Sequence, residues 1–196
     1  MEPHETHEKI AEASHGMLSE RSKRIAILIA VLAALFAIVE TGAKSAQNAY
    51  TASTIEAANL WAFFQAKTLR MTILRTDAEL LETLLPGIGP ADRNRATQQI
   101  AQWRSTAERY DSEPSTQEGR KELTARARVI ETKRDYHLAA YHLFEYSTAA
   151  FQLAIVLASA AVITEVLWLA AVAGGLGLIG VALGTLAWFA PTLIHI

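Results

Sequence analysis

The chain contains no cysteine among its 196 residues. This absence excludes disulfide frameworks, cysteine-ligated zinc or iron–sulfur sites, and cysteine nucleophiles. Charged residues are also scarce, at 19% against 51% hydrophobic residues, and this composition is too apolar for a disordered chain. The 18 basic and 20 acidic residues nearly cancel, so no large field of one sign is available to hold nucleic acid. We therefore expect no nucleic-acid partner.

The charges that are present avoid three stretches of the chain. Ile25–Val39 is a run of 15 apolar residues that follows a basic cluster at residues 21–24. Ser147–Thr164 has 18 residues without a charge, Val166–Ile196 has 31, and only Glu165 separates them. Stretches of about 18 or more such residues match a hydrocarbon core of about 30 Å at about 1.5 Å per helical residue. The sequence therefore predicts an all-α membrane protein, embedded in a lipid bilayer, with three transmembrane helices at residues 21–42, 147–164 and 167–190.

Two alternatives bear on these spans. The first run could be a cleaved signal peptide, but residues 1–20 carry five glutamates, unlike a short cationic start, so an uncleaved span is preferred. The last two spans could turn at Gly174-Gly175, which would bury Glu165 in a span. Trp168 and Trp188 are 20 residues apart, about 30 Å along a helix, which is the separation of the two aromatic belts. A tight turn near Glu165 is therefore expected.

Orientation follows from the basic residues in the short flanks. The N-terminal flank contains four, whereas the final hairpin and the C-terminal end at residues 191–196 contain none. Basic flanks favour the cytoplasmic side. We expect a multi-pass membrane protein with its N-terminus in the cytoplasm and residues 1–20 forming a polar, disordered tail.

Residues 43–146, between the first two spans, form a charged, helical region. They include 14 basic and 13 acidic residues, a balance typical of a water-exposed surface. Apolar residues recur every three or four positions from Ala43 to Leu85, which predicts a long amphipathic helix or coiled coil. Breaks at Pro86–Pro90 and at residues 111–115 divide the region. The prediction is a long-helix bundle, a stalk, with helices at about 43–85, 92–111 and 117–146, the second capped by Asp92 and the third continuing into the second span.

Small residues mark all three spans, and in the last span they are glycines that recur every three or four positions. Such stripes let helix backbones approach closely in a membrane, and we prefer this packing role to a pore lining. In a single chain, three transmembrane helices and an amphipathic stalk would leave some apolar helix faces without a packing partner. A homo-oligomer would bury these faces. The residues assigned to packing or assembly in the last span are Gly177, Gly180 and Gly184.

The candidate metal ligands are weak. His4 and His7 are three apart, whereas the metalloprotease pattern His-Glu-x-x-His has four, and a solvated tail is preferred. His142 and Glu145 could share a ligand, but a zinc site needs further donors. No phosphate loop, nucleophile elbow or useful carboxylate pair is present. We expect neither a cofactor nor an enzymatic activity, and the sequence does not identify a small-molecule ligand.

Glu40 and Glu165 lie at span ends. In an oligomer, either residue could form a ring of negative charge around an axis and so serve a cation path. The alternative is a carboxylate that lies among headgroups or in a turn, and this reading is preferred.

Three segments carry a resemblance to a known family. They are NLWAFFQAK at residues 59–67, HLFE at 142–145 and QLAIVLAS at 152–159. Together they resemble a bacterial membrane family described as domain of unknown function 4337, over nearly the whole chain. The resemblance implies a helical inner-membrane protein without naming an activity, and the final hairpin departs from the family by its lack of basic residues. Within the first segment, Trp61 and Phe64 are expected to pack the first long helix against the third or against a neighbouring chain.

The expected function is that of a non-enzymatic, homo-oligomeric membrane scaffold with a helical stalk. One alternative is an ion-conducting homo-oligomer that uses Glu40 or Glu165. The other is a sensory input subunit, because two spans that bracket a helical bundle are similar to the input half of a bacterial chemoreceptor. A sensor of this kind would need a separate output partner, since only about 24 residues precede the first span.

Overall fold

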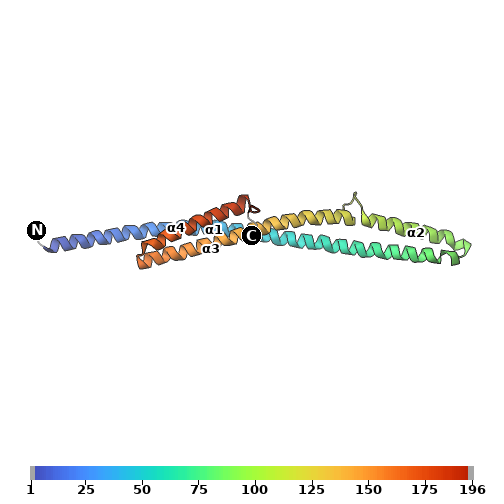
Figure 1. Cartoon of the computed structure of the whole chain (residues 1–196), viewed down its shortest axis with the longest axis horizontal. Coiled ribbons are helices and arrows are strands. Elements are labelled where there is room, and N and C mark those ends of the chain that lie inside the picture. The colour runs from blue at the N-terminus through green and yellow to red at the C-terminus, as the bar shows by residue number, and fades with distance from the viewer. Residues whose placement is uncertain (1–2, 194–196) are drawn as a thin grey trace. The chain divides into compact units, whose positions relative to one another are not determined.

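The protein is described by a computed structural model that covers the backbone of residues 3–193 and their side chains apart from those of residues 3–19 and 21. The elements in chain order are α1 (Pro3–Leu84), the short 3-10 helix η1 (Leu85–Gly87), α2 (Pro90–Asp111), α3 (Arg120–Thr164) and α4 (Leu167–Phe189) (Figure 1). No strand occurs in the described part of the chain, so the all-α class is confirmed. Helices α1, α3 and α4 are long and apolar enough to cross a membrane.

Three helix starts differ from the expectations. α1 begins at Pro3, so most of the tail that was expected to be disordered is helical. The alanines, glutamates and lysine of this segment have high helix propensity, and extending an existing helix avoids the cost of nucleating a new one. α2 begins at Pro90 with Gly89, not Asp92, as the N-cap residue, because proline suits the first helical position. α3 begins at Arg120, after Gln117 has adopted a φ of 59°, which lies outside the helical region.

The chain divides into two units. Residues 1–49 and 136–196 form the first, here called the apolar unit, and residues 50–135 form the second, here called the charged unit. Helices α1 and α3 each contribute to both units without a break.

The apolar unit packs α1, α3 and α4 around small side chains. Its core includes Leu32 and Val39 of α1 and the fully buried Phe151 of α3. The alanines of α3 at positions 150, 154, 158 and 161 are all buried, at 8%, 0%, 0% and 1% exposure. Many large apolar side chains face outward instead, such as Ile163 and Phe189, each 83% exposed. The bundle is therefore apolar both inside and outside.

The glycines of α4 lie where this helix meets its neighbours. A Cβ at Gly180 would lie 2.9 Å from the Phe151 ring, and one at Gly184 would lie 3.1 Å from Val39. A Cβ at Gly177 would meet Leu32. The Ser147 hydroxyl donates a hydrogen bond of 2.6 Å to the carbonyl of Gly180. This bond satisfies the one buried polar side chain among the described residues of this unit. Close backbone approach thus depends on glycine at these positions.

The charged unit contains the second half of α1, all of α2 and the first part of α3. Its core is formed by Leu60, Leu123 and Ala127, with Trp61 and Phe64 packed against them. The turn between α2 and α3 is closed by the Glu122 carboxylate, which accepts hydrogen bonds from the Ser112 hydroxyl (2.7 Å) and the Glu113 amide (3.1 Å). These two hydrogen bonds lower the pKa of Glu122.

Candidate functional site

The buried stripe of α1 in the charged unit faces α2 and α3. Ala57, Leu60, Met71 and Ala78 are at most 8% exposed and lie on the apolar series that the sequence predicts. A helix packed on one side is expected to be polar on the other. α1 departs from this rule.

A second apolar series lies on the opposite side of α1. Each of its residues lies two positions before or after a residue of the buried stripe. Two positions correspond to a rotation of about 200° around a helix, so the two series lie on opposite sides of α1. Leu69 is 63% exposed, Leu80 58%, Ile55 57% and Ile73 49%. We call this surface the α1 seam, and define it as Ile55, Asn59, Ala62, Ala66, Leu69, Ile73, Thr76 and Leu80, all exposed.

The α1 seam has the spacing of a coiled coil. Its residues follow one another at alternating steps of four and three, which is the heptad pattern of a and d positions. Asn59, Ala66, Ile73 and Leu80 occupy the a positions in this register, and Ile55, Ala62, Leu69 and Thr76 occupy the d positions. The seam was not predicted from the sequence, although the sequence contains a signal for it. That signal is a second apolar series with the same period as the first, offset from it by two positions.

Two cations hold the helices of the charged unit together on its inner side. The Lys67 ammonium lies 4.9 Å from the centre of the Tyr110 ring and 3.8 Å from the Glu118 carboxylate, and the residue is 6% exposed. Arg120 lies 5.0 Å from the centre of the Phe64 ring and donates to Asp111 at 3.4 Å. The ring and the carboxylate compensate for the loss of water around the buried Lys67. Arg120 is 24% exposed, and its Nε is buried without a hydrogen-bond partner.

Asp111 joins the end of α2 to the start of α3. The Lys121 ammonium lies 3.0 Å from its carboxylate, and this hydrogen bond is the main reason that the pKa of Asp111 is lowered. The charges of Arg120 and Arg75 lower it further. The ionised form of Asp111 is thus the one that the folded unit favours.

Trp61 and Phe64 were expected to pack the first long helix against the third or against a neighbouring chain. In the structure they lie where α1 packs against α3. The Trp61 indole N–H donates a 2.9 Å hydrogen bond to the Glu131 carboxylate on α3. The two aromatic rings meet edge to face, with centroids 5.4 Å apart. Within one chain, the pair therefore joins α1 to α3.

The two glutamates considered for an ion path lie in different structural environments. Glu40 forms a 3.0 Å salt bridge with Lys44 one turn further along α1. Glu165 lies between α3 and α4, with a φ of 58°, and is exposed. Gly174 and Gly175 lie inside α4, so the turn between these helices is at Glu165.

The candidate metal ligands do not gather. The His142 ring lies 3.4 Å from Glu145, whose carboxylate also accepts a 2.6 Å hydrogen bond from the Tyr141 hydroxyl. This hydrogen bond raises the pKa of Tyr141. Among the side chains that the structure describes, no three His, Asp or Glu residues could hold a metal ion. The side chains of His4 and His7 lie outside the described ones.

One family model matches the chain. It covers residues 21–190 and is described as "Domain of unknown function (DUF4337)". No curated protein and no solved structure matches the chain.

Proposed function

Because the chain belongs to the DUF4337 family, whose description states no activity, we propose a function from geometry: a non-enzymatic membrane scaffold that assembles into a homo-oligomer through the α1 seam. The seam is the observation that carries this proposal. The apolar unit is the membrane anchor, and the charged unit is the part that the anchor holds in water.

The outer surface of the apolar unit supports the anchor role. Leu178 is 73% exposed, and Ile163 and Phe189 are 83% exposed. Full burial of each such side chain away from water is worth about 1.5–3 kcal/mol. A bilayer removes them from water while the helices keep their backbone hydrogen bonds internal. The basic flank at residues 21–24 supports a cytoplasmic N-terminus in an inner membrane, with the charged unit on the opposite side.

The same anchor explains why the seam pairs with its own copy. Chains inserted in one orientation present their seams in parallel, which is the geometry in which a and d residues meet their counterparts. Asn59 at an a position is the type of residue that fixes register in such pairs. The flanking positions that would face each other, such as Gln65 and Arg70 of two copies, include no pair of like charges. A parallel dimer is therefore the smallest assembly that buries the seam.

The absence of cysteine allows a direct test. Ala66→Cys places one thiol at an a position, where a parallel dimer brings two copies within disulfide reach. Mild oxidation of membrane vesicles should convert this variant to a covalent dimer. Val129→Cys is the matched control, because Val129 is 57% exposed on α3 and lies outside the seam. Equal cross-linking of the two variants would refute assembly through the seam.

Membrane insertion is tested separately. The scaffold should stay in the pellet when vesicles are washed with alkaline carbonate and should need detergent for extraction. Release into the carbonate supernatant would overturn the anchor role, whatever the cross-linking shows.

A further inference from the structure

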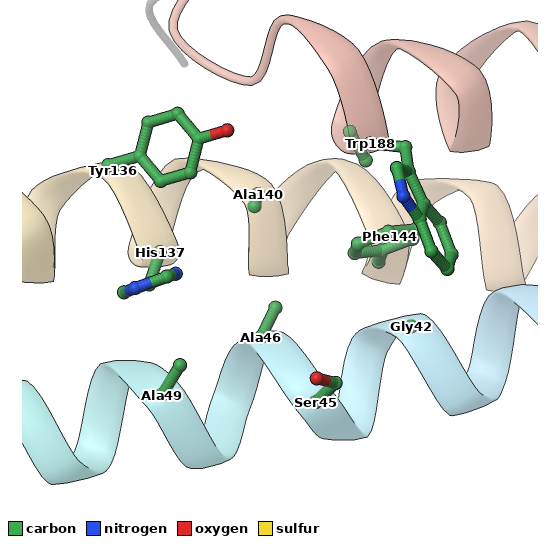
Figure 2. Close-up of a pocket in the computed structure, with 10 residues that line it drawn as sticks. Gly42, Ser45, Ala46, Ala49, Tyr136, His137, Ala140, Phe144 and Trp188 are labelled. Atoms are coloured by element: carbon green, nitrogen blue, oxygen red, sulfur yellow. The ribbon is translucent and has the colours of Figure 1, made fainter.

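Two pockets adjoin within the apolar unit. The first, here called the polar pocket, has a volume of about 260 Å³ and lies between α1 and α3 (Figure 2). His137 points from α3 toward α1, where Ser45, Ala46 and Ala49 form the opposite wall. The Tyr136 ring lies beside His137, with centroids 5.5 Å apart.

Three side chains that can form hydrogen bonds line the polar pocket. Within the described residues, no hydrogen bond engages the Ser45 hydroxyl, the Tyr136 hydroxyl or the His137 ring. Among the residues that the structure describes, no Asp, Glu, Lys or Arg lines the pocket. It is therefore suited to an uncharged group that donates or accepts hydrogen bonds, because a charged group would find no counter-ion there.

The second pocket, here called the apolar pocket, has a volume of about 210 Å³ and lies among Leu35, Ile38, Phe151 and Val181. Thr185 supplies a hydroxyl to its lining, but this hydroxyl already donates to the Ala182 carbonyl at 2.8 Å. Of the described residues that line the apolar pocket, Trp188 is thus the one whose side chain has a hydrogen-bonding group still available, and the rest of the lining offers carbon surface.

Phe144 and Trp188 line both pockets. Their rings meet edge to face at 5.9 Å and 87°. Gly42 lets this pair approach α1, since a Cβ there would lie 2.8 Å from the Phe144 ring and 3.3 Å from Trp188. Neither pocket alone reaches the roughly 300–1,000 Å³ of typical ligand sites, whereas the two together do.

Phe144 and Trp188, which line both pockets, lie at the depth expected for the membrane surface. Gly42 and Trp188 are at or near the expected ends of their spans, and tryptophan is enriched at membrane interfaces. Apart from the shared Phe144, the apolar pocket is lined by residues within the spans, whereas the polar pocket is lined by residues from the interface outward. This placement rests on the proposed membrane anchor.

We infer that the adjoining pockets form one binding site for a neutral membrane amphiphile, with a hydroxyl- or carbonyl-bearing head at Tyr136 and His137 and a hydrocarbon tail in the apolar pocket. The Phe144–Trp188 pair contacts the ligand where head and tail join. A diacylglycerol and an isoprenoid-type quinone share this chemistry, and the experiment distinguishes them.

The experiment titrates the detergent-solubilised full chain with three probes and reads binding by native mass spectrometry. Dioleoylglycerol carries a hydroxyl head, decylubiquinone carries a carbonyl head, and dioleoylphosphatidylglycerol has the tails of the first probe with an anionic head. One neutral probe should bind more tightly than the anionic lipid. Equal or tighter binding of the anionic lipid would overturn the inference.

Separate substitutions test the hydrogen-bonding end and the apolar end of the site. Tyr136→Phe with His137→Phe removes the hydrogen-bonding groups and keeps the bulk, so neutral-probe affinity should fall about tenfold, as expected for the loss of one or two hydrogen bonds. Val181→Phe should weaken binding by filling the apolar pocket. The matched control is Tyr146→Phe with His142→Phe, because these residues of α3 line neither pocket. Should the double variant fail to fold, Tyr136→Phe alone removes only one oxygen.

Unchanged affinity in the head variant and in Val181→Phe, with unchanged melting temperatures, would refute the site. Because binding is measured in micelles, this outcome leaves the carbonate and cross-linking tests of the scaffold unaffected.

Discussion

Truncation of Leu69 is the sharpest quantitative test of the α1 seam. Leu69→Ala removes three carbons from a side chain that is 63% exposed in the single chain. At about 0.8 kcal/mol for each buried carbon, burial of that exposed share in a dimer is worth about 1.5 kcal/mol per copy. Since both copies lose it, the dimer should be weakened by about 3 kcal/mol, which corresponds to a dissociation constant about a hundredfold higher.

The assay is energy transfer between two labelled populations of the full chain, diluted in lipid vesicles. Alanine has the highest helix propensity, so α1 itself should not be weakened by the change. Val129→Ala is the matched control, because it truncates a residue of similar exposure (57%) outside the seam and should leave dimerisation unchanged. If both variants dimerise like the unmodified chain, the reasoning from exposed area to assembly is wrong.

Three further predictions concern packing, pH and topology. Gly180→Ala should lower the melting temperature in detergent, because its Cβ would lie 2.9 Å from an aromatic ring and overpacking typically costs about 1–3 kcal/mol; Gly175→Ala, with nothing within 4 Å, should not lower it. The lowered pKa of Asp111 contributes stability that is present above its ordinary pKa and is lost as the pH falls through the lower folded value. Chemical unfolding at neutral and strongly acidic pH should therefore show a smaller acid-induced loss for Asp111→Asn, and an equal loss would contradict the assignment. In right-side-out vesicles, Glu165→Cys should resist a membrane-impermeant maleimide that labels Val129→Cys; the reverse pattern would invert the proposed orientation.

The helical architecture is predictable from sequence because its breaks are local. Pro86 and Pro90 end one helix and start another, since proline lacks the amide that a continuing helix needs. Glu165 is predictable as a turn because it is the only charge in a long uncharged segment. These signals depend on single residues and their immediate neighbours.

The start of α3 was predicted less well. Residue 117 was expected to begin the helix, but Glu122 closes the preceding turn through the Ser112 hydroxyl and the Glu113 amide. That closure delays the helix to Arg120. A carboxylate nine or ten residues away decides this boundary, and local propensity does not include it.

The candidate sites were predictable only in part. Trp61 and Phe64 were identified because an aromatic cluster on an amphipathic helix indicates packing. The α1 seam was missed because its residues look like ordinary members of an outer face until burial shows that the other stripe is the packed one. The pockets could not be predicted, since Gly42, Phe144 and Trp188 are far apart in sequence and meet only through the packing of three helices.

The unbroken course of α1 and α3 through both units has a practical consequence for fragment studies. A fragment of residues 50–135 would cut each helix within its hydrogen-bonded ladder, and each cut exposes about four amides or carbonyls that have lost their partners. New termini in the middle of a helix also fray. A soluble fragment therefore needs engineered capping residues at both cuts, such as serine or aspartate before residue 50, so that stability measured on it reflects the helical hairpin and not the severed ends.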